Sequence, residues 1–444
     1  MTNSAQDRGW SLNLSFRPAT AALAMAIVFS LTVVVTQSAQ AQTFTVLHAF
    51  TGGTGGYYPG AGITSDSSGN LYGAAAFGGV YNSNCDSEGT RTGCGVVYRM
   101  SHRGSGWTFN ILYSFDGTDG YNPGQLITVA SDGSLYSTAY WGGTGNCNGF
   151  APGCGTVFRL QPPPTFCRAV LCPWTGTELH DFLGGTNDGA LPVFGSLTFD
   201  AAGNLYGTTQ NGGAYGYGIV YELSRNGNGW SMSVLHDFGG PNDGINPWGG
   251  VIFDNAGNMY GTASQGGSGL GVVFELTPSG SGWNETILHN FNYETDGAEP
   301  SGNLVMDASG NLYGTTRGYG PNGGGTIWEI SPANGGWDFS VLHAFVGGNP
   351  GGPLGGLLRD SAGNLYGAAV NDGAHEWGSV FKLSPSNGGW NYTDLYDFTG
   401  GSDGGLPYSN VAMDAGGNIY GVTEVGGALQ DCPSGCGVVF EIAP

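Results

Sequence analysis

Five aspartates occupy the same place in a repeated motif, Asp-Gly-x-x-Pro, and could present a set of carboxylates on one face of the molecule. They are Asp119, Asp188, Asp243, Asp296 and Asp403. Carboxylates and loop carbonyls suit hard cations such as calcium, so one interpretation is a cation or polyol site. The other is that each Asp caps its own turn by accepting nearby backbone N–H bonds. No Asp-x-Asp-x-Asp-Gly calcium loop is present to favour the first interpretation.

A second set of side chains could bind sugars. Aromatic residues lie in or beside the same loops, and a further one opens a neighbouring loop: Tyr58, Tyr121, Trp248 and Tyr408, and then Trp141. An aromatic face flanked by carboxylates and amides is what stacking on a sugar ring requires. The alternative is that these residues pack between adjacent repeat units.

Residues typical of catalysis form no convincing group. Histidines recur at one strand position, and Tyr113 and Tyr396 replace them in two of the repeat units. The histidines are His48, His180, His236, His289 and His343. A residue that is repeated along the chain and exchangeable with Tyr indicates a structural role. We therefore name no catalytic residue.

The composition restricts the elements that can position these residues. Of 444 residues, 86 are Gly and 21 are Pro, and these cost roughly 1 and 3 kcal/mol per helical position. With 40 % hydrophobic and 12 % aromatic residues, the chain can still build a large core. The composition predicts an all-β protein with many tight turns.

The chain is strongly acidic. It has 11 Lys and Arg against 33 Asp and Glu, which gives a formal net charge of −22. Such a surface repels phosphate backbones, so we expect no nucleic-acid partner. Anionic membranes are disfavoured for the same reason. Cations and neutral polar ligands such as glycans remain compatible.

The N-terminus has the features of an export signal. Arg8 and Arg17 precede an apolar run over residues 21–35, and residues 39–41 supply a small-x-small cleavage pattern. We expect residues 1–41 to be a signal peptide and residues 42–444 a single domain that is secreted, periplasmic or at the cell surface. The alternative is an uncleaved membrane anchor, but the apolar run falls short of the roughly 20 residues needed to span. No membrane insertion is expected after cleavage.

Eight cysteines in an exported chain suggest disulfides. They fall into four close pairs, each within one loop: Cys85 with Cys94, Cys147 with Cys154, Cys167 with Cys172, and Cys432 with Cys436. Local pairing is the simplest connectivity. A zinc site is the alternative, but no histidine accompanies these pairs at ligand spacing.

The dominant feature of the sequence is a repeat. A Gly-Asn-Leu-Tyr-Gly pattern recurs in seven units, with a degraded copy in the second: residues 69–73, 133–137, 203–207, 257–261, 310–314, 363–367 and 417–421. A period of this length indicates a propeller or a solenoid. Each unit has four strand-like segments; in the third unit they cover residues 195–199, 204–208, 218–223 and 230–238. Four short antiparallel strands per unit describe a propeller blade, so we predict a seven-bladed β-propeller.

The two ends of the chain favour a propeller over a solenoid. Residues 43–50 resemble a fourth strand with no unit before it, and the last unit stops after its third strand, residues 437–442. We predict that residues 43–50 complete the final blade and close the ring, which removes an open sheet edge.

The repeat unit resembles the GloVer tandem repeat of bacterial "choice-of-anchor" surface and secreted proteins. The resemblance rests on Gly-Asn-Leu-Tyr-Gly, on Gly-Val-Val-Phe-Glu-Leu at 271–276 and on Val-Leu-His-Asp-Phe at 234–238, and it covers residues 43–444. The Asp-x-x-Gly-Asn hairpin is also distantly similar to the NHL-type propeller repeat. The resemblance implies export but no established activity, so it carries over no catalytic residue.

In propellers, the loops from the fourth strand to the next first strand and from the second to the third share one face, usually the ligand face. Three cysteine pairs lie in second-to-third loops of the first, second and last blades, which are neighbours in a closed ring: Cys85 with Cys94, Cys147 with Cys154, and Cys432 with Cys436. We hypothesise that this sector is the specific binding surface. The alternative is that exported loops are stapled against proteolysis.

These observations lead us to expect an exported, non-catalytic propeller that binds an extracellular glycan, a cation or a protein partner on this face. One alternative is a carbohydrate-active or lactone-hydrolysing enzyme that uses the carboxylates of the same face. The other is a structural module of cell-surface assemblies.

Overall fold

The computed structural model describes residues 42–444, except 86–91, 105, 148–152, 165–172, 193–194, 228, 241, 281, 348–350 and 429–431. Within this range, Thr43–Ala443 form one compact unit. The predicted signal peptide, residues 1–41, lies outside the described residues. In the part described, no helix is both long and apolar enough to cross a membrane.

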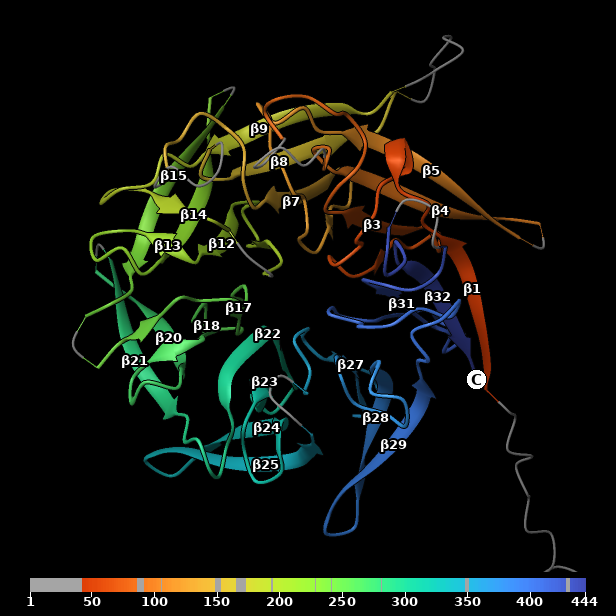
Figure 1. Cartoon of the computed structure of the whole chain (residues 1–444). Coiled ribbons are helices and arrows are strands. Elements are labelled where there is room, and N and C mark those ends of the chain that lie inside the picture. Colours follow the sequence, from red (N-terminus) through yellow and green to blue (C-terminus); the bar gives the residue numbers. More distant parts are fainter. Residues whose placement is uncertain are drawn as a thin grey trace, which may run out of the picture. The chain divides into compact units, whose positions relative to one another are not determined.

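Seven four-stranded antiparallel sheets make up this unit, and they are the seven blades of a β-propeller (Figure 1). Blades 1 to 4 consist of β2 (Thr64–Ser65), β3 (Leu71–Ala75), β4 (Val96–Arg103) and β5 (Gly106–Ser114); β6 (Thr128–Val129), β7 (Leu135–Ala139), β8 (Thr156–Gln161) and β9 (Thr175–Asp181); β11 (Thr198–Phe199), β12 (Leu205–Thr209), β14 (Ile219–Asn226) and β15 (Gly229–Asp237); and β17 (Ile252–Phe253), β18 (Met259–Ala263), β20 (Val272–Ser279) and β21 (Gly282–Asn290). The predicted fold class is confirmed.

Blades 5 to 7 have the same strand order, but the last strand of blade 7 comes from the other end of the chain. They consist of β22 (Ala298–Met306), β23 (Leu312–Gly318), β24 (Gly323–Ala333) and β25 (Gly336–Val346); β26 (Leu358–Arg359), β27 (Leu365–Ala369), β28 (Ser379–Ser386) and β29 (Gly389–Asp397); and β30 (Ala412–Met413), β31 (Ile419–Thr423), β32 (Val438–Ala443) and β1 (Thr43–Ala49). Two short ribbons and one 3-10 turn complete the described elements: β10 (Gly189–Ala190) with β13 (Asn211–Gly212), β16 (Gly244–Ile245) with β19 (Gln265–Gly266), and η1 (Gly53–Gly55).

The first strand of blade 3 is shorter than the sequence predicts. In blade 3 the ladder covers only Thr198–Phe199, although the predicted strand begins at Gly195. The preceding residue Ser196 contacts another blade instead, because its N–H donates to Asn303 Oδ1 at 3.3 Å and its hydroxyl accepts from Asn303 Nδ2 at 2.9 Å. Backbones near the axis therefore bond between blades rather than within one sheet.

An aspartate organises the hairpin that joins the first two strands of a blade. In blade 3, Asp200 Oδ1 accepts the backbone N–H groups of Ala202 and Asn204, while Oδ2 accepts from Asn204 Nδ2 at 2.8 Å and from the Tyr206 hydroxyl at 3.1 Å. Five other blades have the same four bonds, around Asp66, Asp254, Asp307, Asp360 and Asp414. This network explains why Asn and Tyr hold fixed places in the repeat.

The last glycine of the repeat motif lies under an aromatic ring of the third strand. Gly207 on β12 pairs with Tyr221 on β14, and a Cβ atom at Gly207 would meet the Tyr221 hydroxyl at 2.5 Å. The same close approach to a Tyr, Phe or Trp occurs at Gly73, Gly261, Gly314, Gly367 and Gly421. A larger side chain there would displace a buried ring, which explains the glycine.

One type of aromatic pair recurs at every seam between neighbouring blades. A phenylalanine at the end of each fourth strand is at most 1 % exposed, and its ring centroid lies 5.0–5.5 Å from the third-strand aromatic ring of the next blade. The pairs are Phe50–Tyr98, Phe115–Phe158, Phe182–Tyr221, Phe238–Phe274, Phe291–Trp328, Phe345–Phe381 and Phe398–Phe440. Such pairs contribute about 1 kcal/mol each beyond the burial of their area.

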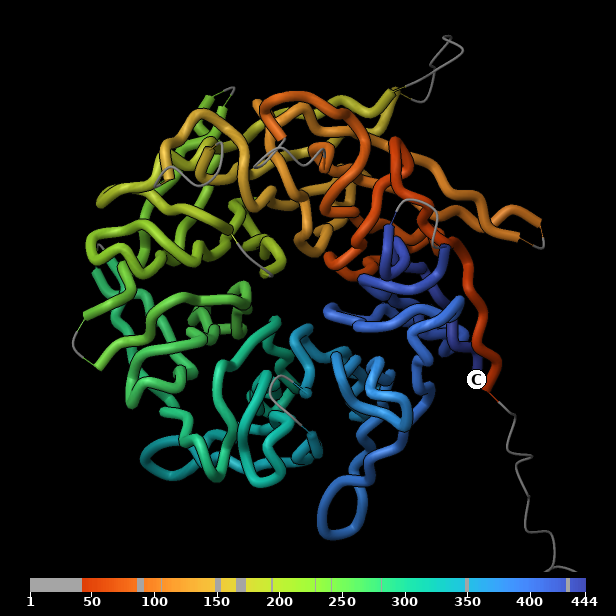
Figure 2. Tube along the Cα trace, viewed as in Figure 1, coloured from red at the N-terminus to blue at the C-terminus, as the bar shows by residue number. Residues whose placement is uncertain are grey.

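The first strand of the chain closes the ring, as predicted. β1 pairs antiparallel with β32 from Thr43↔Ala443 to Ala49↔Val438, and Figure 2 shows the N-terminal strand in red beside the blue C-terminal blade. A register shift between Val46 and His48 matches the shift between the third and fourth strands of the other six blades. β1 therefore has both the position and the register shift of a fourth strand, and it is the fourth strand of blade 7.

Ring closure predicts the cost of removing Phe50. In a closed ring, Phe50→Ala should lower the free energy of unfolding by about 3–5 kcal/mol, the usual cost of removing a fully buried Phe. Phe291→Ala, at an internal seam, is the matched control and should cost the same. Urea unfolding of the two variants measures both values; a Phe50→Ala protein as stable as the wild type would show that the seam between blades 7 and 1 is open.

Candidate functional site

The five motif aspartates are each bonded to a side chain of the fourth strand before them. Three contact a histidine: His180 Nε2 lies 3.0 Å from Asp188 Oδ1, His236 Nε2 lies 3.2 Å from Asp243 Oδ2, and His289 Nε2 lies 2.9 Å from Asp296 Oδ2. The other two accept from the hydroxyls of Tyr113, at 2.5 Å to Asp119, and Tyr396, at 3.1 Å to Asp403. The recurring His or Tyr and the recurring Asp are thus one structural pair.

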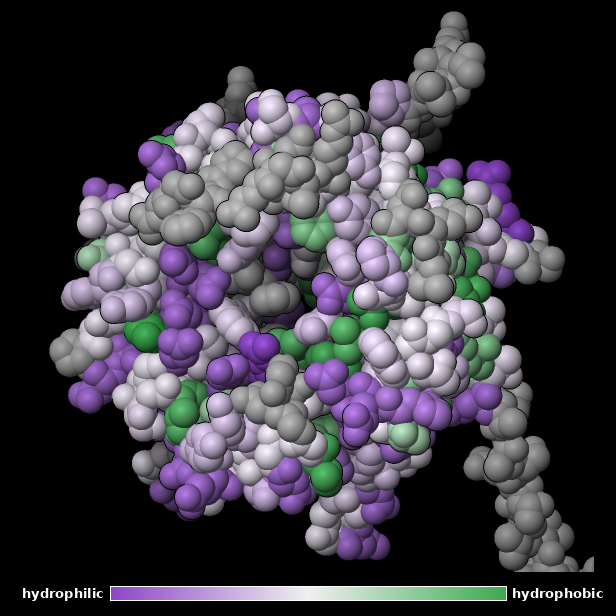
Figure 3. Space-filling model, in the orientation of Figure 1, coloured by the Kyte–Doolittle hydropathy of each residue, from purple (hydrophilic) through white to green (hydrophobic). Residues whose placement is uncertain are grey.

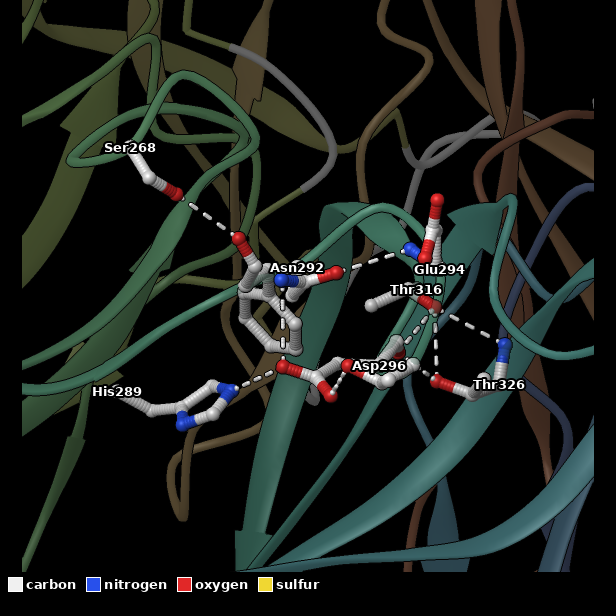
Figure 4. A network of polar contacts seen from close by, with 9 residues as sticks. Ser268, His289, Asn292, Glu294, Asp296, Thr316 and Thr326 are labelled. Atoms are coloured by element: carbon white, nitrogen blue, oxygen red, sulfur yellow. Dashed lines mark hydrogen bonds and ion pairs between the residues drawn. The ribbon is translucent and has the colours of Figure 1, made fainter.

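Turn N–H groups occupy the same carboxylates. Asp296 Oδ2 also accepts the backbone N–H of Asn292 at 3.2 Å, Thr295 Oγ1 donates to Asp296 Oδ1 at 2.6 Å, and the Asp296 carbonyl accepts from Thr326 Oγ1 at 2.6 Å (Figure 4). Asp188 and Asp243 are 9 % and 7 % exposed. The turn-capping geometry considered for this motif is therefore present, with an additional partner from the fourth strand.

A different group of ligand-type side chains lies where five blades converge. A pocket of about 530 Å³ is lined by residues of blades 1, 2, 3, 4 and 7, here called the axial pocket: Tyr58, Gly60, Ala76, Phe77, Asn122, Gly124, Gln125, Tyr140, Gln210, Trp248, Tyr408 and Glu424. Because residues of five blades can meet only near the ring axis, the pocket is the mouth of the central channel. Figure 3 shows this hollow at the centre of the viewed face.

One position of the repeat supplies the rim of the axial pocket. The residue before the motif proline has a left-handed backbone, with φ between 55° and 58°, in six blades: Tyr58, Asn122, Leu191, Asn246, Glu299 and Leu406. This conformation is strained for any residue except Gly. It is held by two bonds: the Tyr58 N–H donates to the Cys436 carbonyl, and the Tyr58 carbonyl accepts the Ala76 N–H, both at 3.1 Å. The rim is therefore bonded to two blades at once.

A second position supplies the wall. In six blades the N–H of the residue after the second strand donates to the carbonyl of this rim residue, and in the pocket the residue is Ala76, Tyr140, Gln210 or Glu424. The repeat fixes the backbone at both positions, while the side chain differs from blade to blade. A comparison of the seven copies for such variable positions would have pointed to Tyr140, Gln210 and Glu424, which sequence reasoning missed.

The axial pocket combines aromatic faces with amide groups. Its aromatic residues are Tyr58, Phe77, Tyr140, Trp248 and Tyr408, and its amides are Asn122, Gln125 and Gln210. Gln125 is 3 % exposed, and its Oε1 has no hydrogen-bond partner among the described residues. An amide oxygen buried without a partner is costly, so it is a candidate acceptor for a ligand hydroxyl.

Glu424 is the one acidic residue that lines the axial pocket among the residues described. Burial raises the pKa of its carboxyl from about 4.5 to about 7, because the charged form is poorly solvated there. At neutral pH this group is divided between a carboxylate and a neutral acid, which can donate as well as accept a hydrogen bond.

Three of the five predicted aromatic residues line the axial pocket, namely Tyr58, Trp248 and Tyr408. Tyr121 is 1 % exposed. Trp141 lines a second pocket of about 530 Å³ between blades 2 and 3, together with Cys147 and Tyr215. None of the five motif aspartates lines either pocket in the described part of the chain.

A continuous aromatic band links these residues across blades 1 and 2. Successive ring centroids lie 4.7–6.3 Å apart, and the rings follow the order Tyr58, Tyr57, Phe77, Tyr121, Trp141 and Tyr140. The band joins the axial pocket to the pocket beside Trp141. The buried Tyr121 supports the band from inside, as the packing interpretation predicts. The rings that line the pockets fit the sugar-binding interpretation.

Three of the four predicted disulfides are present. Cys85–Cys94, Cys147–Cys154 and Cys432–Cys436 have Cα–Cα distances of 5.1, 5.3 and 5.3 Å, and no described cysteine is free. They lie between the second and third strands of blades 1, 2 and 7, which are consecutive in the ring.

The structure does not bear on the fourth predicted disulfide. Both of its cysteines, Cys167 and Cys172, lie outside the described residues. A bond between Cys167 and Cys172 therefore stays a prediction from their spacing. Blades 1, 2 and 7, which carry the other three disulfides, are here called the stapled sector. The predicted Cys167–Cys172 bond is not part of it.

One cysteine of each disulfide accepts a backbone hydrogen bond from a rim residue of the next blade. The carbonyls of Cys94, Cys154 and Cys436 accept the backbone N–H groups of Asn122, Leu191 and Tyr58 at 3.2, 2.8 and 3.1 Å. The first loop also supports the aromatic band, since the Thr92 carbonyl accepts from the Tyr57 hydroxyl at 3.1 Å. The stapled sector is therefore the sector that carries the band.

A family model described as the Gloeobacter/Verrucomicrobia repeat matches residues 148–359 and 335–444. The chain belongs to this family. The match covers five of the seven blades and agrees with the repeat that the sequence resembles. No curated protein matches the sequence.

Solved structures with a similar backbone are propellers of remote sequence. A provisionally assigned 6-phosphogluconolactonase of Bacteroides uniformis shares 14 % identity with a TM-score of 0.46, over 80 % of this chain and 95 % of that one. A Dyadobacter fermentans protein of unknown function shares 10 % identity with a TM-score of 0.44, over 91 % and 98 %. A provisionally assigned glucose dehydrogenase of Thermus thermophilus shares 15 % with a TM-score of 0.39, over 71 % and 95 %. All three share so little with this chain that they say nothing about what it binds.

The raised pKa of Glu424 predicts a pH-dependent stability. Because the pKa is higher in the folded protein than in the unfolded chain, protonation of Glu424 favours the folded state. This contribution to stability is fully present below about pH 4.5 and is lost as the pH rises through about 7. Glu424→Gln removes this loss, so the variant should gain up to about 3 kcal/mol over the wild type between about pH 5 and pH 8.

Urea unfolding at the two pH values measures this difference. The control is Glu294→Gln, an exposed glutamate outside the pocket, which should follow the wild type at both. A Glu424→Gln protein with the same pH profile as the wild type would contradict the burial of this carboxyl.

Proposed function

We propose that the protein is an exported, non-catalytic β-propeller that binds a neutral extracellular glycan in the axial pocket and along the adjoining aromatic band. The observation that carries this proposal is the pocket lining: five aromatic rings, three amides and one partly neutral carboxyl, in a volume of about 530 Å³. Aromatic faces with a few placed polar groups suit small polar ligands of this size. The net charge of −22 favours a neutral ligand over an anionic one.

A binding role is favoured over a glycosidase by the number of acids. Glycosidases of the common type need two carboxyl groups on either side of the scissile bond. Among the described lining residues of the axial pocket, Glu424 stands alone. Its raised pKa is the one observation that favours the rival, an enzyme with a single acid–base carboxyl.

The five motif aspartates take no part in this proposal as ligand groups. Their carboxylates already accept from the fourth-strand His or Tyr and, in most turns, from backbone N–H groups. A calcium or polyol site at these turns would have to displace those bonds. A protein partner on the same face and a purely structural surface module remain the alternatives that the binding experiment separates.

Export is supported by two observations. The three disulfides are typical of an oxidising compartment, and the repeat family is named after two groups of bacteria. In the proposal, residues 1–41 are removed as a signal peptide and the mature protein begins at Gln42.

Trp248→Ala tests the proposal most simply. On an array of neutral glycans, with and without a chelator, the wild type should bind without releasing product. Trp248→Ala should weaken that binding at least about tenfold, which corresponds to about 1.4 kcal/mol of lost stacking. The matched control is Tyr293→Ala, since Tyr293 is also aromatic and 52 % exposed but does not line the pocket.

Each other outcome identifies an alternative. Product release that disappears in Glu424→Gln would make the protein an enzyme. Binding that is unaffected by Trp248→Ala would place the glycan outside the axial pocket and refute the proposal. A wild type that binds no glycan would refute the proposal and leave a protein partner or a structural module.

The stapled sector gives a second test of glycan binding. Replacing both cysteines of one pair, Cys85→Ser with Cys94→Ser, releases the loop that holds Asn122 and Tyr57. Glycan affinity should fall several-fold while the ring stays folded, because these bonds orient the pocket rim and the band rather than the seams. Near-ultraviolet circular dichroism monitors folding; an unchanged affinity would support stapling against proteolysis only.

A further inference from the structure

At four of the seven seams a second contact lies beside the aromatic seam pair. The fourth-strand His or Tyr of one blade stacks on an aromatic residue from the fourth strand of the next, with ring centroids 3.9–4.0 Å apart. The stacked pairs are His48–Phe109, His289–Phe339, His343–Tyr392 and Tyr396–Phe44. Each second member lies at the same register position of its strand, as the pairs Met100↔Phe109 and Ile330↔Phe339 show.

At the other three seams this position is not aromatic. It is Gly176 in β9 and Met232 in β15, and between blades 3 and 4 it is Glu285 in β21, which pairs with Leu276 of β20. Its Oε1 lies 3.6 Å from the Nε2 of His236 on β15. A carboxyl group therefore faces the imidazole at the place where the stacked seams have an aromatic ring. The repeat does not require a carboxyl group at this position.

Three potential metal ligands converge at this seam. His236 Nε2 is 3.2 Å from Asp243 Oδ2 and 3.6 Å from Glu285 Oε1, and the ligand atoms of all three residues lie within 4.8 Å of one another. Two ligands that each lie about 2.1 Å from a tetrahedral ion are about 3.4 Å apart. The two distances from His236 Nε2 fit that geometry, and no other group of three such side chains converges in the described part of the chain.

The cluster also contains buried oxygen atoms that nothing in the described chain satisfies. Asp243 is 7 % exposed, and its Oδ1 and the Oε1 of Glu285 have no hydrogen-bond partner among the described residues. A bound cation would give both of these oxygens a partner.

The comparable seams lack this feature. At the seam between blades 2 and 3, Asp188 accepts from two backbone N–H groups and contacts His180, so both of its carboxylate oxygens are bonded. At the seam between blades 4 and 5, Asp296 bonds to His289, to a backbone N–H and to the Thr295 hydroxyl. Neither has an oxygen left over.

We propose that the seam between blades 3 and 4 binds one divalent transition-metal ion of the Zn²⁺ type through His236 Nε2, Asp243 and Glu285. One nitrogen and two carboxylate ligands leave a position for water, as in three-ligand zinc sites. The imidazole disfavours calcium, which takes oxygen ligands. Because β15 and β21 belong to different blades, the ion links them across the seam. None of the three proposed ligands lines the axial pocket.

Zinc titration of the chelator-treated mature protein tests this site. The wild type should bind one Zn²⁺ per chain by calorimetry, with a higher melting temperature in the presence of zinc. Glu285→Gln and Asp243→Asn should each weaken binding at least tenfold and abolish the zinc-dependent shift. The matched control, Asp296→Asn, removes the corresponding Asp from a seam without a second acid and should bind zinc as the wild type does.

Glu285→Phe separates a loss of zinc binding from a failure to fold, because it introduces the residue type found at the stacked seams. It should fold, and it should not bind zinc. A wild type that takes up no zinc, or Glu285 variants that bind it unchanged, would overturn the proposal. Tight binding of Ca²⁺ without Zn²⁺ would overturn the choice of metal.

Discussion

The structure depends on the aromatic pairs that join each blade to the next. Six of the seven are formed between consecutive repeats, and the seventh, Phe50–Tyr98, joins residues brought in by β1 and β4. β1 also pairs with β32 at the other end of the chain, so the same strand joins blade 7 to blade 1. Closing the ring therefore costs one long loop closure, but it buries the last sheet edge and the last ring pair together.

Ring closure also determines where a ligand could bind. The rim residues, such as Tyr58 and Asn122, bond to the preceding blade through their N–H groups and to their own blade through their carbonyls. Their strained backbone is tolerated because both groups are bonded. The repeat thus holds a fixed frame around the axis, and the side chains that differ between copies give the axial pocket its chemistry.

Much of the fold could be predicted because it is encoded locally and seven times. The repeat length, the incomplete last unit and the close spacing of Cys85 and Cys94 each determine a feature without knowledge of distant contacts. The axial pocket was only partly predictable. Tyr140, Gln210 and Glu424 follow strands whose motif residues are nearly constant, and attention to constant residues passes over them. The pairing of each motif Asp with a fourth-strand His or Tyr was also missed, because only backbone partners were considered for the turn.

Hydrogen exchange of the intact mature protein tests the closed ring most directly. β1 and β15 are fourth strands of blades 7 and 3, so their backbone amides have equivalent partners in a closed ring. Peptides covering Thr43–Ala49 should then exchange as slowly as peptides covering Gly229–Asp237. Exchange of the N-terminal strand at the rate of a free terminus, with β15 still protected, would contradict the account.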